Sequence, residues 1–220
     1  MNKGLGILGG SFNPPHIGHL RLAIEVAENF AHCLTRVCLI PCAHPPHKEE
    51  SHLLPFAMRC SMLENACAGS SALSVSTIEG ERNEPSYTWD TLTRLKQRHP
   101  ESPLFFILGA DDYQQIGTWY QGEALPTLTN FIVVPRMSQP EDRFVADTKS
   151  LWPQARFANN SAFLPGGGVA VFFQPPLVTI SATAIRSRFL RGQSIRFLVP
   201  EMIDTFLQEH RTLVSAIWGK

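Results

Sequence analysis

The sequence contains no apolar run that approaches the roughly 18 residues a membrane-spanning helix requires. Nothing at its start resembles a signal peptide, so we expect a protein without a membrane partner. An excess of charge of one sign is also missing, because 19 Lys and Arg balance 19 Asp and Glu. A formal net charge of zero does not favour a broad basic surface, so no nucleic-acid partner is expected.

Cysteine is sparse, and its spacing is not that of a disulfide framework. Five cysteines are present, an odd number, and no two form a C-x-x-C pair. This pattern favours reduced, mostly buried thiols over a disulfide scaffold or a zinc site, and we therefore predict a cytoplasmic protein. The cysteines are Cys33, Cys38, Cys42, Cys60 and Cys67.

The composition is that of a globular chain, with 44% hydrophobic and 17% charged residues. A length of 220 residues allows one α/β domain with a sizeable core. We therefore assign residues 1–220 to a single domain, whose C-terminal portion, from about residue 181, is expected to be helical.

Apolar runs and apolar periodicity alternate along the chain. Short apolar runs predict strands at 5–8, 37–40, 73–77, 104–108, 131–134, 169–173 and 178–180. Helical spacing of apolar residues predicts helices at 17–30, 56–68, 88–98, 181–190 and 201–210. The stretches 44–52 and 159–168 are expected to be loops. Strands separated by helices imply right-handed crossovers and a doubly wound, mostly parallel sheet flanked by helices.

The most informative segment is Gly-Gly-Ser-Phe-Asn-Pro-Pro-His-Ile-Gly-His at 9–19, between the first predicted strand and the first long helix. Open α/β sheets bind ligands at this end of their strands. The two glycines allow a sharp turn and a close approach of the backbone to a ligand. Pro15 suits the opening of a helix, where the first N–H group has no intrahelical partner.

Two histidines follow in this segment. His16 and His19 are three residues apart and should project from the same face of the first helical turn. Gly18 between them leaves room for a phosphate to lie against the helix. The free N–H groups and the positive end of the helix dipole favour an anion there. Two imidazole donors above that point suit the charge that develops on a phosphoryl group under attack.

Other interpretations of these residues remain open at this point. The histidines could be ordinary surface residues, or ligands of a zinc site that would need further ligands nearby. Residues 4–9, Gly-Leu-Gly-Ile-Leu-Gly, also match the dinucleotide fingerprint literally. That fingerprint must follow a strand, and only residues 1–3 precede it, so these glycines are expected inside the first strand.

Segment 9–19 resembles the phosphate-binding signature of the nucleotidyltransferases that share the H-x-G-H motif, and it also resembles class I aminoacyl-tRNA synthetases. The superfamily's second signature, I-S-[ST]-T-x-[IV]-R, is similar to Ile-Ser-Ala-Thr-Ala-Ile-Arg at 180–186, with Ala182 replacing a small hydroxyl residue. Ser181 is expected to cap a helix there, while Thr183 and Arg186 face a phosphate. Taken alone, the segment could also be an ordinary capped helix.

Further stretches are similar to the bacterial nicotinate-nucleotide adenylyltransferases, and they occur in the order of that family. They are Pro-Pro-His-Lys at 45–48, Pro-Ser-Tyr-Thr at 85–88, Leu-Gly-Ala-Asp at 108–111 and Thr-Trp-Tyr at 118–120. The resemblance implies a Rossmann-like nucleotidyltransferase fold. It also implies transfer of AMP from ATP to nicotinate mononucleotide, which gives deamido-NAD and pyrophosphate in NAD biosynthesis.

The resemblance implies a set of site residues as well. The catalytic residues would be His16, His19 and Arg186. ATP would be bound by Gly9, Gly10, Ser11, Phe12, Gly18, Ser181, Thr183 and Arg136. Nicotinate mononucleotide would be bound by Lys48, Tyr87, Thr88, Gly109, Asp111, Trp119 and Tyr120. Trp119 would stack on the nicotinate ring, and the amides of Thr88 and Tyr120 would hold its carboxylate. The alternatives are core packing for the two aromatic residues at 119–120 and a solvated loop at 47–48.

The mechanism follows from the reactants. The acceptor is a phosphate monoester with a second pKa of about 6, so it is largely ionised near pH 7 and needs no general base. His16 and His19 would stabilise the α- and β-phosphates, while Ser181, Thr183 and Arg186 stabilise the β- and γ-phosphates. Mg²⁺ would be carried mainly by the triphosphate and water, with no metal site built from the protein.

Three competitors share part of these motifs. A class I synthetase would need a K-M-S-K-S-type loop and a tRNA-binding domain, and the sequence shows neither. A phosphopantetheine adenylyltransferase shares both phosphate signatures but is not expected to carry the stretches at 86–88 and 118–120. A nucleotide sensor without enzyme activity would not need His16, His19 and Arg186 together.

Overall fold

The computed structural model describes residues 3–46, 52–135, 140–176 and 178–220. These residues form an eight-stranded sheet in the order β3-β2-β1-β4-β5-β8-β7-β6. The first six strands in this order run parallel, and only the hairpin at one edge is antiparallel. The strands are β1 (Gly4–Gly10), β2 (Leu34–Pro41), β3 (Leu73–Val75), β4 (Leu104–Gly109), β5 (Asn130–Val134), β6 (Arg156–Ala158), β7 (Ser161–Phe163) and β8 (Val169–Phe172).

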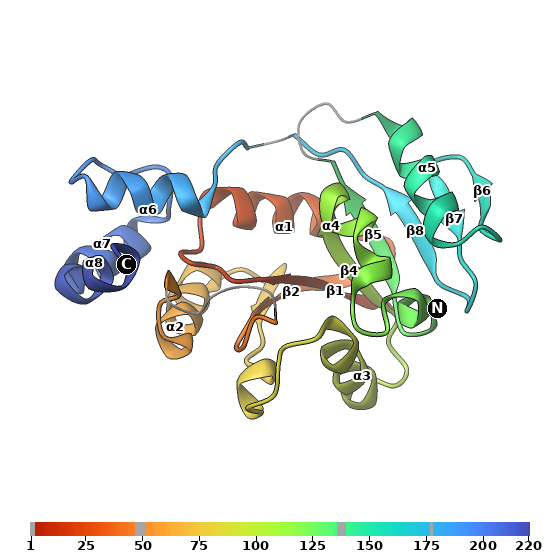
Figure 1. Ribbon diagram of the computed structural model, residues 1–220, viewed down its shortest axis with the longest axis horizontal. Coiled ribbons are helices and arrows are strands. Elements are labelled where there is room, and N and C mark those ends of the chain that lie inside the picture. Colours follow the sequence, from red (N-terminus) through yellow and green to blue (C-terminus); the bar gives the residue numbers. More distant parts are fainter. Residues whose placement is uncertain (1–2, 47–51, 136–139, 177) are drawn as a thin grey trace.

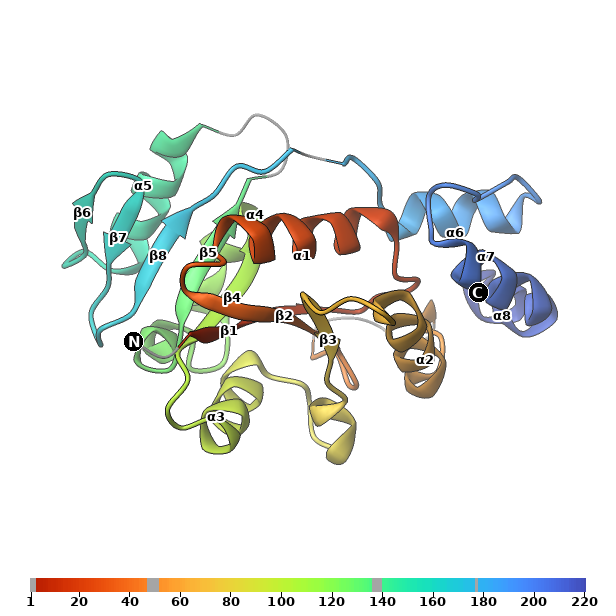
Figure 2. The same ribbon diagram turned by 180° about the vertical axis from the view of Figure 1, so that it is seen from behind.

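Helices cover both faces of the sheet, and further helices lie beyond one of its ends. Figure 1 shows α1 on one face and α3 on the other, and Figure 2 shows the same layers from behind. The C-terminal helices α6, α7 and α8 lie at the end opposite to the β6–β7 hairpin. The helices are α1 (Ile17–Asn29), α2 (Phe56–Cys67), α3 (Thr88–Arg98), α4 (Ala110–Gln114), α5 (Glu141–Leu151), α6 (Ala182–Leu190), α7 (Glu201–Glu209) and α8 (Arg211–Trp218).

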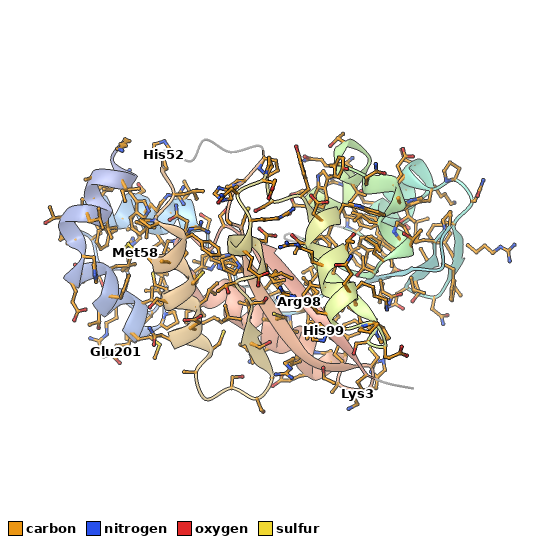
Figure 3. All side chains as sticks on the ribbon, turned by 90° about the horizontal axis from the view of Figure 1, so that it is seen from below. Lys3, His52, Met58, Arg98, His99 and Glu201 are labelled. Carbon is orange, nitrogen blue, oxygen red and sulfur yellow. The ribbon has the colours of Figure 1, made fainter. Side chains whose placement is uncertain are left out.

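Buried apolar side chains form three clusters. One lies between the sheet and the helices α3 to α5, and a second lies between the sheet and α1 with α2. A third joins α6, α7 and α8 to Leu54 and to Met62 of α2. Met58, also on α2, packs against this third cluster and is seen beside the C-terminal helices in Figure 3. The C-terminal helices are therefore attached to the rest of the molecule through α2.

The order of the strands reverses its direction between β1 and β4. From β1 the chain continues outward to β2 and β3, whereas β4 lies on the other side of β1 and continues to β5. The loops that leave the carboxyl ends of β1 and β4 therefore separate to opposite faces, which is where open α/β sheets bind their ligands. Residues 9–19 and 109–111 both lie at this point.

The doubly wound, mostly parallel sheet confirms the expected fold class, and helix 88–98 has the predicted bounds. The glycines at 4–9 lie inside β1, as expected. The strand predicted at 178–180 is wrong, because after β8 the chain leaves the sheet and crosses toward the start of α1 (Figure 1). The loop predicted at 159–168 contains β7, a three-residue strand held by its two neighbours.

Candidate functional site

A tight loop connects β1 to α1, and we call residues 9–16 the phosphate loop. Phe12 in this loop has a φ of 45°, a left-handed conformation that is uncommon for a residue with a side chain. Its ring is buried, 2% exposed, and faces Gly10, where a Cβ atom would lie only 3.3 Å from the ring. Gly10 therefore lets the aromatic ring fill the space beneath the loop, so Phe12 can offer a ligand mainly its backbone.

His16 and His19 form a compact pair at the start of α1. His16 is the N-cap residue, and its backbone N–H donates to Nδ1 of His19 at 3.3 Å. The two rings are stacked with centroids 3.6 Å apart, and the His19 ring lies edge-on to Phe12 at 4.9 Å. The ring of His16 is buried, and its Nδ1 has no hydrogen-bond partner among the described residues. The expected placement of both imidazoles on one face is confirmed.

Both imidazoles are neutral near pH 7. Burial lowers the pKa of His16 to about 4. Burial, with a smaller contribution from the neighbouring charge of His16, lowers the pKa of His19 to about 3. Each ring can therefore donate one N–H to an anion without carrying a charge of its own. A bound triphosphate would raise both pKa values, because a nearby negative charge favours the protonated form.

The structure corrects two expectations about this helix start. Pro15 lies before the N-cap and does not open the helix, which begins at Ile17. The space beside Gly18 is taken by protein, since a Cβ atom there would lie 3.0 Å from Nδ1 of His16. Gly18 is thus needed for the packing of the His16 ring. The N–H of Ile17 donates to the carbonyl of Leu198 at 3.0 Å, so the first helical N–H is already satisfied by the C-terminal segment.

The start of α6, which carries the second phosphate-binding signature, contacts the phosphate loop before α1. Ser181 caps α6, as predicted, and its hydroxyl accepts a hydrogen bond from the N–H of Ala184 at 3.2 Å. Arg186 reaches back across the molecule: its Nη1 donates to the carbonyl of Asn13 at 2.9 Å, and its Nη2 donates to Oγ1 of Thr183 at 3.1 Å. Partial burial lowers the pKa of Arg186. Two segments 173 residues apart thereby share one site.

Two of the stretches expected to bind the acceptor also meet. Tyr87 is the residue before α3, and its ring lies 4.9 Å from that of Tyr120. Thr88 begins α3, as predicted. Trp119 is partly buried against the core, with its ring 6.4 Å from Phe106, whereas Tyr120 is 50% exposed. Packing in the core therefore explains part of the position of the Trp119 side chain and little of the position of the Tyr120 side chain.

Gly109 and Asp111 lie at the end of β4. Gly109 is the N-cap residue of α4, and the carboxylate of Asp111 lies in the first turn of that helix. Oδ1 of Asp111 is 3.5 Å from Nη2 of Arg143 on α5. The β4 loop therefore presents a helix start with a paired carboxylate. Lys48 and Arg136, which were expected to bind the two substrates, lie outside the described residues.

The sequence motifs did not assign a role to two residues that organise the site. Asn13 is 3% exposed, and its side chain bonds to the main chain at His52 and Leu54. Arg59 on α2 is 1% exposed and donates to the carbonyls of Ser11, Cys42 and Leu54. Asn13 belongs to the motif at residues 9–19. For Arg59, the only hint in the sequence is that an arginine stands among the apolar residues of α2. Both hold the phosphate loop against the segment that leads into α2.

Over the parts of the chain that the structure describes, no group of three or more His, Cys, Asp or Glu side chains is placed to hold a metal ion. The same residues include no helix long and apolar enough to cross a membrane. All five cysteines are free thiols, and burial raises the pKa of each of them.

Comparison with protein families and curated relatives gives a consistent result. Residues 7–188 match the model of the cytidylyltransferase-like family. A probable nicotinate-nucleotide adenylyltransferase of Geobacter sulfurreducens is 38% identical over 209 residues, which is 94% of this chain and 96% of the relative. A protein of the same description from Lactiplantibacillus plantarum is 33% identical, over 95% of this chain and 87% of the relative.

Solved structures support the same fold. The nicotinic acid mononucleotide adenylyltransferase of Plasmodium falciparum, in a complex with NaAD, aligns with a TM-score of 0.74 at 19% sequence identity. The alignment covers 96% of this chain and 97% of that chain. The same protein in a complex with APC aligns with a TM-score of 0.73.

Proposed function

The chain belongs to the nicotinate-nucleotide adenylyltransferases of the cytidylyltransferase-like family, and we propose how its own side chains carry out that reaction. A phosphate oxygen of nicotinate mononucleotide attacks the α-phosphorus of ATP. The bond from that phosphorus to the bridging oxygen of the β-phosphate breaks, and pyrophosphate leaves. The products are deamido-NAD and pyrophosphate, so the reaction is a step of NAD biosynthesis.

The contact between Arg186 and Asn13 is the observation that supports this function best. It brings the capped start of α6, with its hydroxyls and guanidinium, to the phosphate loop that leads into the two imidazoles. Among the described residues, the bonds to Asn13 and Thr183 are the only hydrogen bonds of Arg186. Three of its five N–H groups therefore remain for the β- and γ-phosphates.

The imidazoles act at the α- and β-phosphates. His16 and His19 are neutral donors, fixed by stacking before the substrate arrives. Negative charge that builds on the phosphoryl oxygens during attack strengthens these hydrogen bonds without a rearrangement of the protein. The acceptor phosphate is already ionised, so the main task of the site is to hold two anions in line.

The acceptor lies at the segments 87–88 and 119–120. We place the nicotinate ring against Trp119 and its carboxylate at the amides of Thr88 and Tyr120. Thr88 is the first residue of α3, where the helix dipole favours an anion. The contact between the Tyr87 and Tyr120 rings supports this placement, because it brings the two segments together.

Mg²⁺ would be held at this site mainly by the phosphates of ATP. The side chains assigned to the phosphates are imidazoles, hydroxyls and a guanidinium, and the Asp111 carboxylate is paired with Arg143. Such a donor set fits an ion that keeps its phosphate and water ligands rather than one held in a protein cage. When bound, Mg²⁺ offsets part of the charge of the triphosphate. The free thiols support a reducing, cytoplasmic setting for the reaction.

Release of pyrophosphate from MgATP with a panel of acceptors tests this function. The panel contains nicotinate mononucleotide, nicotinamide mononucleotide, phosphopantetheine and no acceptor. Nicotinate mononucleotide should give the highest kcat/KM. Release that is equally fast without any acceptor, or fastest with phosphopantetheine, contradicts the proposed function.

A further inference from the structure

The C-terminal helix α8 contacts the phosphate loop directly. The indole Nε1–H of Trp218 donates to Oδ1 of Asn13 at 3.3 Å, although the two residues are 205 positions apart in the sequence. Both side chains are buried, at 5% and 3% exposure. The Trp218 ring packs edge-on against Phe189 of α6, with centroids 5.3 Å apart. The indole is therefore held on one side by α6 while its N–H points at the loop.

The side chain of Asn13 is held from three directions. Its Nδ2 donates to the carbonyl of His52 at 2.7 Å, and its Oδ1 also accepts from the N–H of Leu54 at 3.1 Å. His52, labelled in Figure 3, lies near the C-terminal helices. Indole and backbone N–H groups can only donate, so the atom that faces Trp218 and Leu54 must be the carboxamide oxygen. The amide plane of Asn13 is thereby fixed in a single orientation.

The backbone of Asn13 connects this fixed side chain to Arg186 at the reaction site. Its carbonyl oxygen accepts from Nη1 of Arg186 at 2.9 Å. A long, flexible arginine side chain loses less conformational freedom on binding a phosphate when it is already anchored in place. Asn13 supplies one anchor, and the hydroxyl of Thr183 supplies the other.

We propose that Trp218 and Asn13 are positioning residues for Arg186, so that the last helix of the chain sets the ATP subsite through two consecutive hydrogen bonds. Neither residue has to touch the substrate in this arrangement. The proposal rests on the proposed function, because it assumes that Arg186 binds the phosphates of ATP.

The test compares two tryptophans in like surroundings. Trp218→Phe removes the indole N–H and keeps an aromatic ring against Phe189. Trp152→Phe is the matched control: Trp152 is also 5% exposed, and its Nε1 donates to the carbonyl of Glu123 at 3.0 Å, within the cluster between the sheet and α5. Both variants lose one indole hydrogen bond, and melting temperatures report whether they are destabilised to a similar extent.

Steady-state kinetics with MgATP and nicotinate mononucleotide separate the two variants. Trp218→Phe should lower kcat/KM for ATP by roughly 3- to 10-fold, the range expected for one hydrogen bond. In Trp218→Phe the KM of the acceptor should stay within about twofold of the wild-type value. Both substrates' KM values should stay within the same range in Trp152→Phe, since neither indole N–H bonds to a residue proposed to bind the acceptor. Equal kinetics in the two variants would overturn the proposal, whatever their stability.

A double-mutant cycle with Arg186→Ala shows whether the effect passes through Arg186. If it does, Trp218→Phe should have no further effect on kcat/KM for ATP in the Arg186→Ala background. Additive losses would overturn the positioning role and leave the proposed function intact. A normal ATP KM in Arg186→Ala alone would instead refute the role of Arg186 itself, so the two failures are distinguishable.

Discussion

The two stacked imidazoles at the start of α1 are both uncharged near pH 7 in the ligand-free protein. Their centroids are 3.6 Å apart, and burial already disfavours the charged form of each ring. The site thus offers preformed hydrogen-bond donors of zero net charge, held by Phe12 from below. A triphosphate provides the negative charge that would make protonation favourable. Donor geometry is therefore fixed before binding, whereas the charge of the site depends on the substrate.

Replacement of His19 tests the role of these donors. His19→Ala should lower kcat by roughly 100-fold or more, the scale of losing one preorganised donor to a developing charge. The protein should remain folded, because residue 19 lies in the first turn of α1 and alanine favours a helix. Single-turnover kinetics and a circular dichroism spectrum check both points. Near-normal turnover would contradict the catalytic assignment.

Replacement of Arg186 tests the ATP subsite. Arg186→Ala should increase the KM of ATP by a much larger factor than the KM of the acceptor. Arg186→Lys should recover only part of the lost ATP binding, because the planar fork of donors is lost. Initial rates measured over a grid of both substrates give the two constants. If the KM of the acceptor alone rises, the two subsites are reversed.

The lowered pKa values predict how stability depends on pH. Both folded-state pKa values lie below the ordinary value of 6.5, so protons bind the unfolded chain first as the pH falls. Stability should therefore decrease from about pH 6.5 toward pH 4, by roughly 1–2 kcal/mol per histidine between pH 7 and pH 5. Melting temperatures without ATP measure this loss.

His16→Asn should flatten the loss of stability between pH 7 and pH 5. The control is His99→Asn, which makes the same replacement at an exposed imidazole at the end of α3. Equal slopes in the wild-type protein and His16→Asn would show that His16 is not buried as a neutral group.

At the scale of elements, helix starts define the site. The starts of α1, α3, α4 and α6 carry His16, Thr88, the Gly109–Asp111 turn and Ser181 respectively. Partial positive charge at helix N-termini favours anions, and both substrates are anions. The carbonyl of Leu198 already accepts the first N–H of α1. This helix therefore contributes its side chains to the site more than its backbone.

The start of α3 predicts the choice between two acceptors. Nicotinate mononucleotide should be used better than nicotinamide mononucleotide, because a carboxylate matches the amide donors that we propose at Thr88 and Tyr120. An amide group would bring its own donor toward those N–H groups, which costs on the order of 1–3 kcal/mol, or roughly 10- to 100-fold in kcat/KM. Rates for both mononucleotides at saturating MgATP measure the ratio. A preference for the amide would overturn this pocket while leaving the AMP transfer in place.

At the scale of the whole molecule, α2 connects the sheet to the C-terminal helices. The third apolar cluster contains Leu54 and Met62 together with α6, α7 and α8. The hydrogen bonds from Trp218 and Arg186 to Asn13 add polar links between the same parts. We propose on this basis that residues 1–220 fold as one domain, with no separate C-terminal unit.

Two leucines of the C-terminal helices test this proposal. Leu207 on α7 is fully buried, so Leu207→Ala should destabilise the protein by about 2–5 kcal/mol. Leu213 on α8 is 47% exposed, and Leu213→Ala is the matched control with little expected effect. Unfolding followed by circular dichroism and by loss of activity should give one coincident transition, shifted as a whole in Leu207→Ala. Separate transitions for the two signals would show that the C-terminal helices unfold independently.

Elements with strong apolar patterns were predictable, and elements that depend on their neighbours were not. The buried parallel strands are continuous apolar runs, and α3 has a clear amphipathic pattern between Thr88 and Arg98. The helix α5 is mostly polar, and the strands β6 and β7 are three residues each, so their sequences carry little signal. The helix α8 has apolar residues at helical spacing, but it follows α7 after a break at His210 and was missed for that reason.

The sequence by itself determined the fold class, the phosphate loop with His16 and His19, and the second helix start with Ser181 and Arg186. These features are local: turn chemistry, helix capping and short motifs act within a few residues, so the order of the amino acids suffices. Only the tertiary structure decided that the Gly18 position makes room for the His16 ring and that Leu198 occupies the first N–H of α1. It also decided that Asn13 joins Arg186 to Trp218. The two contacts to Asn13 join residues that are 173 and 205 positions apart in the sequence. They form because α6 and α8 pack with α2 in one apolar cluster beside the phosphate loop, and no local pattern encodes which side chains meet there.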